Sequence, residues 1–302
     1  MSTRASRFAV VDIGSNTVKL SVYDCRDDGP QGIVHDADTI RVGYRVSETG
    51  AVSPERVERL VECLLRFEDM ARSHGAVTFH AVATQAFRIA RNTRSIVERI
   101  ERETSWRVRV IDAAEETRLT IEGAQPWLAA GRVNVVADIG GASTEVIAVD
   151  PEGMVRSGGS IPVGSGLLFD EEITASPPPA GSVDRARERV TDLLDSSGLV
   201  PGRASVLLLP GGTGRYLRLL LESIDPTIPF GPAGLPVLHD WLAVRHASET
   251  MERIPVQNER AQVLPASLAI VEALVLRMSP TDITAVPSGI RDGVARTVCA
   301  SR

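Results

Sequence analysis

The stretch VVADIGGASTEVIAVD, residues 135–150, decides the expected fold. An apolar run ends on Asp138, passes through two glycines and two hydroxyl residues, and continues as a second apolar run. This pattern predicts a hairpin whose turn can hold a phosphate group. Glycine lets the backbone bend sharply or approach a ligand, so that consecutive N–H groups converge on an anion. The residues expected to form the cradle are Gly140, Gly141, Ala142, Ser143 and Thr144.

Two carboxylates flank this predicted turn. Asp138 stands at the end of the first strand, and Glu145 follows the turn. Oxygen ligands beside a phosphate suit a hard cation such as Mg²⁺ or Mn²⁺, which would offset the repulsion between the carboxylates and the anion. We therefore expect Asp138 and Glu145 to be metal ligands.

The same pattern occurs earlier in the chain, in FAVVDIGSNTVKLSVYD, residues 8–24. The two stretches align without a gap, so that Asp12 falls on Asp138 and Gly14 on Gly140. Two copies of one motif predict two similar subdomains. A duplicated hairpin without a ligand is the structural alternative, but a core has no need of an acid at the same strand end twice. We expect Asp12 to orient the metal or its waters, and a second phosphate loop at Gly14, Ser15, Asn16 and Thr17.

A third glycine-rich turn lies in LPGGTGRYLRLL, residues 209–220. The order of strand, turn and helix directs a helix N-terminus at an anion. Such turns also occur without phosphate, and the presence of two other loops in the same chain strengthens the functional interpretation. The residues expected to bind here are Gly211, Gly212 and Thr213.

The motifs VVDIGSNTVKL and ADIGGASTE resemble those of the Ppx/GppA phosphatase family, within the actin/hexokinase/Hsp70-like superfamily. Further stretches resemble family blocks in the expected order. They are AVATQAFRIARN (81–92), AAEETRLTIEG (113–123), LPGGTGRYLRLL (209–220), VLPASLAIVEAL (263–274) and PSGIRDGV (287–294).

The resemblance covers nearly the whole chain and implies an α/β fold of two RNase H-like subdomains with an active-site cleft between them. We place the subdomains at residues 1–130 and 131–302 and expect the last helix to return to the first. Family members are exopolyphosphatases and guanosine pentaphosphate phosphohydrolases. The resemblance therefore implies hydrolysis of a terminal phosphoanhydride.

The resemblance also assigns two catalytic residues. Glu116, the second acid of AAEETR, would be the general base that orients and deprotonates water. Without the resemblance, acids at this position would be explained by the helix dipole alone. Arg88 follows a predicted strand end, and an arginine of this block lies beside the substrate in the family. We expect Arg88 to face phosphate, because a guanidinium group can bind it through two parallel hydrogen bonds.

Three features depart from the family pattern. Ala142 replaces a usual third glycine and brings a methyl group into the cradle, while Lys19 replaces a frequent arginine and gives a point charge. We also expect no counterpart of the additional C-terminal helical domains of longer members. We therefore expect lower processivity on long polyphosphate chains.

Composition narrows the remaining possibilities. With 302 residues, 43% of them hydrophobic, the chain is expected to be soluble and large enough for two domains. A net charge of −6 argues against nucleic-acid binding. Without a membrane-length apolar run or a signal sequence, we expect a cytoplasmic protein that does not bind membranes. Cys25, Cys63 and Cys299 are widely separated, so we expect reduced thiols with no role in chemistry.

The sequence leaves several functions open. Inorganic polyphosphate is the favoured substrate, because only six Phe, three Tyr and three Trp are present and no aromatic pocket for a guanine is visible. A guanosine penta- or tetraphosphate is the alternative. ATP-driven sugar phosphorylation is disfavoured by the EETR block. A non-catalytic polyphosphate- or alarmone-binding regulator is disfavoured by the intact acids at 12, 116, 138 and 145, and a homodimer is left open.

Overall fold

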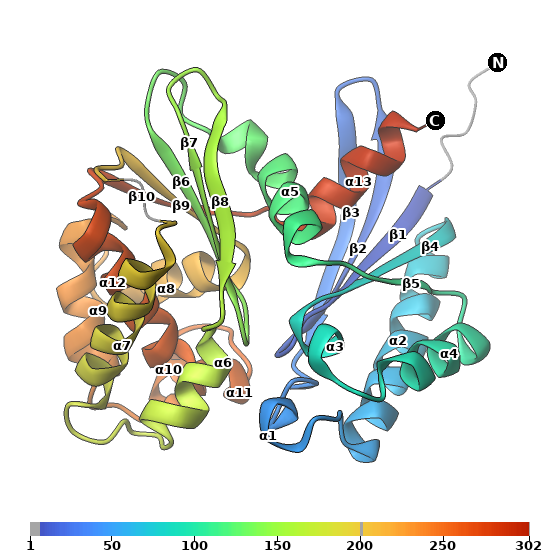
Figure 1. Ribbon diagram of the computed structural model, residues 1–302, viewed down its shortest axis with the longest axis horizontal. Coiled ribbons are helices and arrows are strands. Elements are labelled where there is room, and N and C mark those ends of the chain that lie inside the picture. The colour runs from blue at the N-terminus through green and yellow to red at the C-terminus, as the bar shows by residue number, and fades with distance from the viewer. Residues whose placement is uncertain (1–6, 200–201, 302) are drawn as a thin grey trace. The chain divides into compact units, whose positions relative to one another are not determined.

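The chain forms two compact units in a computed structural model that describes residues 7–199 and 202–301 (Figure 1). Unit 1 consists of Met1–Gly123 together with Ile290–Arg302, and unit 2 is Ala124–Gly289. The division thus falls between Gly123 and Ala124, whereas the boundary expected from the sequence follows residue 130. Residues 1–6, where we expect no signal sequence, lie outside the described residues.

The sheet of unit 1 has five strands in the order β3-β2-β1-β4-β5. The first three strands form an antiparallel meander, while β4 runs parallel to β1 and β5 runs parallel to β4. The strands are β1 (Arg7–Ile13), β2 (Val18–Arg26), β3 (Gly29–Asp38), β4 (Ala76–Ala83) and β5 (Arg107–Val110). The helices are α1 (Val46–Thr49), α2 (Pro54–Ser73), α3 (Gln85–Ile89), α4 (Thr93–Glu103), α5 (Ala113–Ala124) and α13 (Ile290–Ala300).

Helix α2 shows how the sequence sets these elements. Ser53 caps the helix by accepting a hydrogen bond from the N–H of Arg56, and Pro54 occupies the first turn, where a missing N–H costs nothing. Leu60, Leu64 and Phe67 recur on one face and are fully buried. Ser53 and Pro54 predict this start from the sequence, and it is confirmed. The spacing of apolar residues also predicts a buried face, but Leu65, expected on that face, is 42% exposed.

Unit 2 repeats the strand arrangement of unit 1, with the order β10-β9-β6-β7-β8. Its strands are β6 (Asn134–Ile139), β7 (Thr144–Val149), β8 (Val155–Ile161), β9 (Val206–Pro210) and β10 (Asp282–Val286). The α-helices are α6 (Ser165–Leu168), α7 (Ser182–Ser197), α8 (Gly211–Ile224), α9 (Leu235–Leu242), α10 (Ala247–Arg253), α11 (Asn258–Gln262) and α12 (Leu264–Met278). Short π- and 3₁₀-helices lie at η1 (Gln125–Trp127), η2 (Phe169–Ile173) and η3 (Pro232–Gly234).

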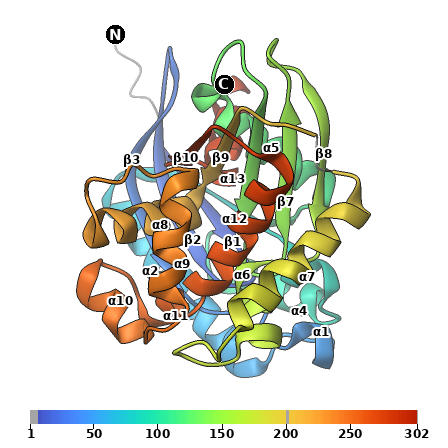
Figure 2. The same cartoon turned by 90° about the vertical axis from the view of Figure 1, so that its left-hand side faces the viewer.

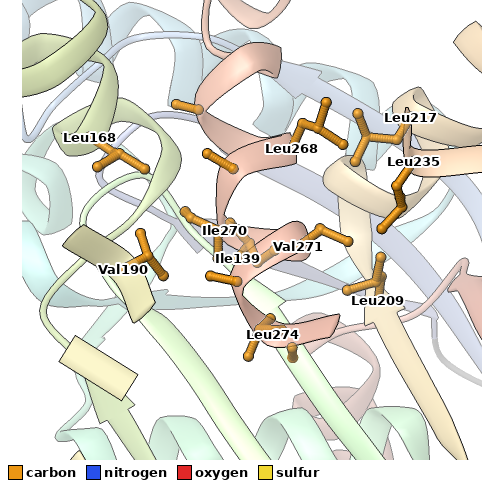
Figure 3. Close-up of a cluster of buried hydrophobic side chains, with 14 of the residues drawn as sticks. Ile139, Leu168, Val190, Leu209, Leu217, Leu235, Leu268, Ile270, Val271 and Leu274 are labelled. Atoms are coloured by element: carbon orange, nitrogen blue, oxygen red, sulfur yellow. The ribbon is translucent and has the colours of Figure 1, made fainter. Parts of the chain in front are cut away.

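Helix α12 is the centre of the unit 2 core. Figure 2 shows it between α7 and α8, and Figure 3 shows its apolar side chains surrounded by those of neighbouring elements. A helix that is apolar over most of its surface is expected to be largely buried, and Leu268, Ile270 and Leu274 have no exposed surface. From the sequence, Pro265 predicts a kink or a split in a helix over residues 258–278. The structure has the split, because α11 ends at Gln262 and Pro265 lies in the first turn of α12.

Two sequence-based expectations were wrong. The sequence of residues 241–253 predicts one helix, but α9 ends at Leu242 and α10 starts after His246, whose N–H donates to Glu249 Oε1 at 3.1 Å. The cysteines are not all reduced, because Cys25 and Cys299 form a disulfide across 274 positions of sequence, with Cα atoms 5.6 Å apart. Helix α13 brings Cys299 to β2, a contact that cysteine spacing does not reveal.

Further contacts hold α13 in unit 1. Arg291 Nη1 donates to Leu20 O at 2.5 Å, and Tyr23 Oη donates to Asp292 Oδ1 at 3.0 Å. Cys63 is a buried thiol, and burial raises its pKa to about 12. Among the described helices, none is both long and apolar enough to cross a membrane.

Candidate active site

The first phosphate loop follows β1 and is shaped by a tight turn. The N–H of Gly14 donates to Thr17 O at 3.2 Å, and a Cβ atom on Gly14 would lie only 2.9 Å from that same oxygen. Glycine is therefore required here by the close approach of the loop to itself. From the sequence alone, backbone bending or the approach of a ligand was the expected reason for this glycine.

The carbonyl groups of this loop are held by the segment after β3. The N–H of Arg41 donates to Asn16 O at 2.8 Å, and the N–H of Gly43 donates to Ser15 O at 2.7 Å. The N–H groups of Ser15 and Asn16 make no hydrogen bond within the described part of the chain. Successive N–H donors of this kind form an anion-binding concavity.

Two buried side-chain atoms at the first loop also lack a partner among the described residues. They are Asp12 Oδ1 and Asn16 Nδ2. The other oxygen of Asp12, Oδ2, lies 3.7 Å from Lys19 Nζ. An unsatisfied buried polar group costs about 1–3 kcal/mol, so both atoms fit a site that is completed by an ion, water or ligand.

The second phosphate loop, after β6, has the same construction. The N–H of Gly140 donates to Ser143 O at 2.9 Å. Its carbonyls are held by α6, where the N–H of Ser165 donates to Gly140 O at 2.9 Å and that of Leu167 donates to Gly141 O at 2.8 Å. The N–H groups of Gly141 and Ala142 form no hydrogen bond within residues 7–199 and 202–301, which leaves them as donors for an anion.

Asp138 and Glu145 stand directly opposite each other on β6 and β7. Glu145 is only 2% exposed and accepts a hydrogen bond from Ser160 Oγ at 2.8 Å. Like charges directly opposite on an antiparallel pair destabilise it, so a cation placed at this pair would relieve the repulsion. The donor oxygens therefore fit a hard divalent cation.

The ligand count limits the kind of metal site. No three His, Cys, Asp or Glu side chains in the described residues gather as a metal-binding group. Mg²⁺ is commonly held by one or two carboxylates, with water and substrate phosphates completing its shell. Asp138 and Glu145 fit this type of site. Asp12 belongs to unit 1, and its share in metal binding stays a prediction.

The third loop is the N-terminus of α8. Gly211 has φ 74°, a left-handed conformation that favours glycine, and its N–H donates to Ser288 O at 3.1 Å. Thr213 Oγ1 accepts a hydrogen bond from Arg260 Nη2 at 2.9 Å. The positive end of the helix dipole and the guanidinium group of Arg260 thus lie at one turn.

Sequence reasoning missed Arg260. Its guanidinium group is buried although part of the side chain is exposed, and burial lowers its pKa, against the opposite effects of Tyr216 and Asp138. No salt bridge within the described residues involves it. A buried cation without an ion-pair partner is expensive, so Arg260 is suited to an anionic ligand. Its position shortly before the VLPASLAIVEAL block was the available signal.

Ser288 is a second missed residue. Its Oγ is buried and has no hydrogen-bond partner among the described residues. The neighbouring Gly289 lies close to the metal-ligand candidates, since a Cβ atom there would be 3.9 Å from Asp138 Oδ2. Ser288 and Gly289, from the start of the PSGIRDGV block, thus lie in the same region of unit 2 as the second and third loops.

Glu116 lies on the first turn of α5, which Asp112 caps by accepting a hydrogen bond from the N–H of Glu115 at 2.8 Å. Glu116 is 3% exposed, and its Oε2 accepts a hydrogen bond from Arg88 Nη1 at 2.5 Å. The carboxylate is thus buried and held in one direction by a charged partner. This arrangement suits a positioned acid or base.

Arg88 is turned towards protein groups. Its Nη1 also donates to Ile111 O at 3.1 Å, and its Nε and Nη2 donate to Gln85 Oε1 at 3.0 and 2.7 Å. With the bond to Glu116, four of its five N–H groups are engaged. The phosphate-facing role of Arg88 stays a prediction, and a two-bond contact with phosphate would require it to exchange some of these partners.

These unit 1 residues share one edge of the sheet. The N–H of Thr84 donates to Ile13 O at 3.3 Å, and the N–H of Ile111 donates to Ala83 O at 3.0 Å. The carboxyl ends of β1, β4 and β5 therefore adjoin, and the first loop, Arg88 and Glu116 follow these ends. In open α/β sheets, ligands bind at this edge.

Comparison with known proteins identifies this arrangement. Residues 21–225 match the model of the Ppx/GppA phosphatase family. The chain belongs to that family. Among relatives of this Ppx/GppA member, exopolyphosphatase 1 of Mycobacterium leprae is 29% identical, with coverage of 95% of this chain and 88% of the relative. Guanosine-5'-triphosphate,3'-diphosphate pyrophosphatase of Vibrio atlanticus is 25% identical, but the match covers only 58% of that protein.

Solved structures confirm the predicted fold of two mixed-sheet α/β subdomains. An exopolyphosphatase from Cytophaga hutchinsonii gives a TM-score of 0.87 at 22% identity, with 98% of both chains covered. A Ppx/GppA enzyme of Aquifex aeolicus gives 0.76 at 26% identity, with 96% of this chain and 99% of that chain covered.

In this Ppx/GppA phosphatase, the predicted site residues form two groups. Unit 1 holds Asp12, the first loop, Arg88 and Glu116, while unit 2 holds Asp138, Glu145 and the second and third loops. Each group gathers at the carboxyl ends of the parallel strands of its own sheet. That both groups meet one substrate stays a prediction.

Proposed function

We propose that this protein is an exopolyphosphatase, which hydrolyses the terminal phosphoanhydride bond of inorganic polyphosphate and releases orthophosphate. The observation that carries the proposal is the combination of two loops, each with carbonyls held from behind and successive N–H donors left for an anion, with a buried, oriented Glu116. Family membership and the exopolyphosphatases among its relatives support it.

The loops would bind the substrate. Within the loops Gly14–Thr17 and Gly140–Thr144, the N–H groups left by the internal hydrogen bonds, those of Ser15, Asn16, Gly141 and Ala142, would cradle phosphate oxygens. Gly211–Thr213 would add a helix N-terminus. Arg260, beside Thr213, would contribute a fixed positive charge. These donors are already oriented before the reaction, so they need no reorganisation as charge develops in the transition state.

Glu116 would activate the nucleophile. Its carboxylate would accept a proton from water as the water oxygen bonds to the terminal phosphorus and the bridging P–O bond breaks. The electrons of the broken bond remain on the shortened polyphosphate. Arg88 would fix the direction of the Glu116 carboxylate through its 2.5 Å hydrogen bond. Phosphoryl transfer passes through a loose transition state, in which the bonds to the attacking and leaving oxygens are both weak. Positioning of the reactants and stabilisation of charge therefore supply most of the catalysis.

A divalent cation, Mg²⁺ or Mn²⁺, would neutralise negative charge on the phosphate oxygens when bound. Asp138 and Glu145 are the residues proposed to hold it, with Asp12 as a further contributor. The carboxylates of the second hairpin would otherwise repel a polyanion.

A guanosine pentaphosphate 5'-phosphohydrolase is the second candidate, and the match to the Vibrio atlanticus protein favours it. The same loops and the same base would act on a nucleotide's terminal phosphate. The composition argues for polyphosphate, because the chain has few aromatic residues with which to hold a guanine.

The deciding experiment measures phosphate release from defined-length polyphosphates and from pppGpp, side by side, with Mg²⁺ and after chelation. We expect a higher kcat/KM for polyphosphate and loss of activity in excess EDTA. A higher kcat/KM for pppGpp would reverse the substrate assignment. Binding of either compound without phosphate release would identify a non-catalytic regulator.

A further inference from the structure

The segment after β3, residues 40–52, holds the carbonyl side of the first phosphate loop. The N–H of Gly43 donates to Ser15 O at 2.7 Å, and a Cβ atom on Gly43 would lie only 2.8 Å from the Cβ of Ser15. The peptide group that joins Ser15 to Asn16 is planar and trans, so its C=O and N–H point in opposite directions. The bond from Gly43 therefore directs the N–H of Asn16, one of the donors proposed for phosphate, away from the segment 40–52.

The other end of the segment 40–52 is held by the residues that follow Arg88. The N–H of Arg91 donates to Gly50 O at 2.9 Å. Asn92 makes two hydrogen bonds to the backbone of one residue, because its Oδ1 accepts from the N–H of Val52 at 3.1 Å and its Nδ2 donates to Val52 O at 2.9 Å. A side-chain amide has the acceptor and the donor that such a pair of contacts needs.

The side chain of Asn92 is used for this contact in place of a more common one. Asn92 is the N-cap residue of α4, a position at which an asparagine usually accepts a hydrogen bond from the backbone of its own helix. Here the side chain makes no capping bond to the described helix, and its amide bonds to Val52. Asn92 therefore serves the segment 40–52 and not the start of α4.

Helix α1 connects the two ends of the segment 40–52. The N–H of Val46 donates to Gly43 O at 3.1 Å, and the N–H of Gly50 donates to Val46 O at 2.7 Å. Val46 and Val52 are buried in one hydrophobic core with Phe87, which precedes Arg88 on α3. A displacement at Gly50 is therefore expected to move Gly43 as well.

We propose that Asn92 is a positioning residue, which fixes the first phosphate loop relative to Arg88 and, through Arg88, to Glu116. The proposal rests on the proposed function. Arg88 lies shortly before Asn92 in the chain and holds the Glu116 carboxylate by its 2.5 Å hydrogen bond. Asn92 and Gly43 thus connect a phosphate-binding donor with the proposed base, all within unit 1. A misplacement of about 1 Å between reacting groups can cost roughly a hundredfold in rate, so Asn92 acts on catalysis without touching the substrate.

The test compares Asn92→Ala with Asn134→Ala. Asn134 makes the same pair of contacts in unit 2, where its Oδ1 accepts from the N–H of Ala129 and its Nδ2 donates to Ala129 O, both at 2.9 Å. It is the first residue of β6, at the opposite end of that strand from the second loop. Both variants should have a lower melting temperature, because each loses hydrogen bonds to the backbone. Only Asn92→Ala should also lower kcat for polyphosphate, by roughly tenfold.

A double-mutant cycle separates positioning from a loss of stability. If Asn92 acts through the spacing between phosphate and base, Asn92→Ala should lower kcat far less when Glu116→Gln is already present. The same fold-change in both backgrounds would overturn the proposal, and so would equal kinetics for Asn92→Ala and Asn134→Ala.

A second variant covers the case in which Asn92→Ala does not fold. Asn92→Asp keeps the size and the acceptor oxygen, but a carboxylate cannot donate to Val52 O. It should therefore lower kcat by at least roughly threefold. Wild-type kcat in a folded Asn92→Asp protein would contradict the proposal.

Equilibrium binding of tripolyphosphate, measured on proteins that carry Glu116→Gln, separates this inference from the proposed function. Asn92→Ala should weaken binding roughly two- to fivefold, because the N–H of Asn16 is no longer held in one direction, while Asn134→Ala should not. If the wild type releases no phosphate from any polyphosphate, the proposed function fails. Weaker binding by Asn92→Ala would then still support its positioning role, and equal binding by the two variants would overturn it.

Discussion

The hairpin of β1 and β2 and the hairpin of β6 and β7 place a pair of side chains opposite each other at the same step of the strands. In unit 1, Asp12 faces Lys19, whose ammonium group lies 3.7 Å from the carboxylate. In unit 2, Asp138 faces Glu145. The loops between the strands have the same internal hydrogen bond, from Gly14 to Thr17 and from Gly140 to Ser143.

The two hairpins share the same loop hydrogen bond and differ in the charge of the facing pair of side chains. The first hairpin offsets its acid with its own lysine, so it can meet a polyanion directly. The second hairpin carries two facing acids, a pair that a cation would stabilise. We therefore expect one replacement at equivalent positions, Lys19 against Glu145, to separate a hairpin that binds phosphate from a hairpin that binds a metal ion.

The largest expected effect concerns Glu116, the proposed base, which lies in the same unit as the hairpin with the Asp12–Lys19 pair. Glu116→Gln keeps the size and most hydrogen bonds but removes the basic oxygen. We expect kcat to fall by about 10²–10⁴-fold with little change in substrate Kd. Glu115→Gln is the matched control, since Glu115 is the adjacent acid and pairs with Arg109 and Arg118. A fully active Glu116→Gln protein would falsify the assignment of the base.

The next effect concerns the acid pair of the second hairpin. Glu145→Gln should raise the Mg²⁺ concentration needed for half-maximal activity by at least roughly tenfold, because a ligand oxygen loses its charge. Without metal, the same variant should be more stable by about 0.2–1 kcal/mol, because the repulsion from Asp138 is removed. Ser160→Ala, which removes only the hydrogen bond to Glu145, should shift the Mg²⁺ dependence less. An unchanged Mg²⁺ titration for Glu145→Gln would remove Glu145 from the metal site.

A smaller effect is expected for Arg88→Lys, which tests whether unit 1 needs an oriented base. A lysine cannot reproduce the contacts to Gln85, Ile111 and Glu116 together, so we expect kcat to fall about tenfold. Arg88→Ala should also reduce the free energy of unfolding by about 3 kcal/mol, because it removes one member of a buried ion pair. Arg91→Lys, in the same block, is the control. Equal kinetics for Arg88→Lys and wild type would show that the several N–H donors of the guanidinium group are not needed.

The smallest effect is expected at Lys19. Lys19→Gln removes the positive charge that faces Asp12. The facing pair of the first hairpin then has a net negative charge, as the pair Asp138 and Glu145 has in the second hairpin. We expect KM for polyphosphate to rise roughly two- to fivefold, with the rise diminishing at high salt, because a partly exposed charge is screened. The Mg²⁺ requirement should stay as in the wild type. A change in Mg²⁺ dependence, with KM unaffected, would reverse the roles given to the two hairpins.

What could be predicted from the sequence was local. Both hairpins, the third glycine turn and the start of α2 follow from short patterns of apolar residues, glycines and caps, and so does the facing pair Asp138 and Glu145. These features are encoded within a few neighbouring positions, where strand alternation and turn geometry are decisive.

What could not be predicted depends on contacts between distant segments. Arg260 reaches Thr213 across 47 positions, and Arg88 reaches Glu116 across 28. No role was predicted for Arg260, and Arg88 was expected to face phosphate. Only the fold shows which group each guanidinium meets, because many partners are compatible with one arginine in a sequence.

The Cys25–Cys299 disulfide gives the chain a ring topology. The chain leaves unit 1 after Gly123 and returns at Ile290, so the whole of unit 2 lies between the two linked cysteines. A protease that cuts once in a loop of unit 2 therefore yields two pieces that remain covalently joined. On a denaturing gel without reductant such nicked protein stays near full-length mass, and it separates into fragments only after the bond is reduced.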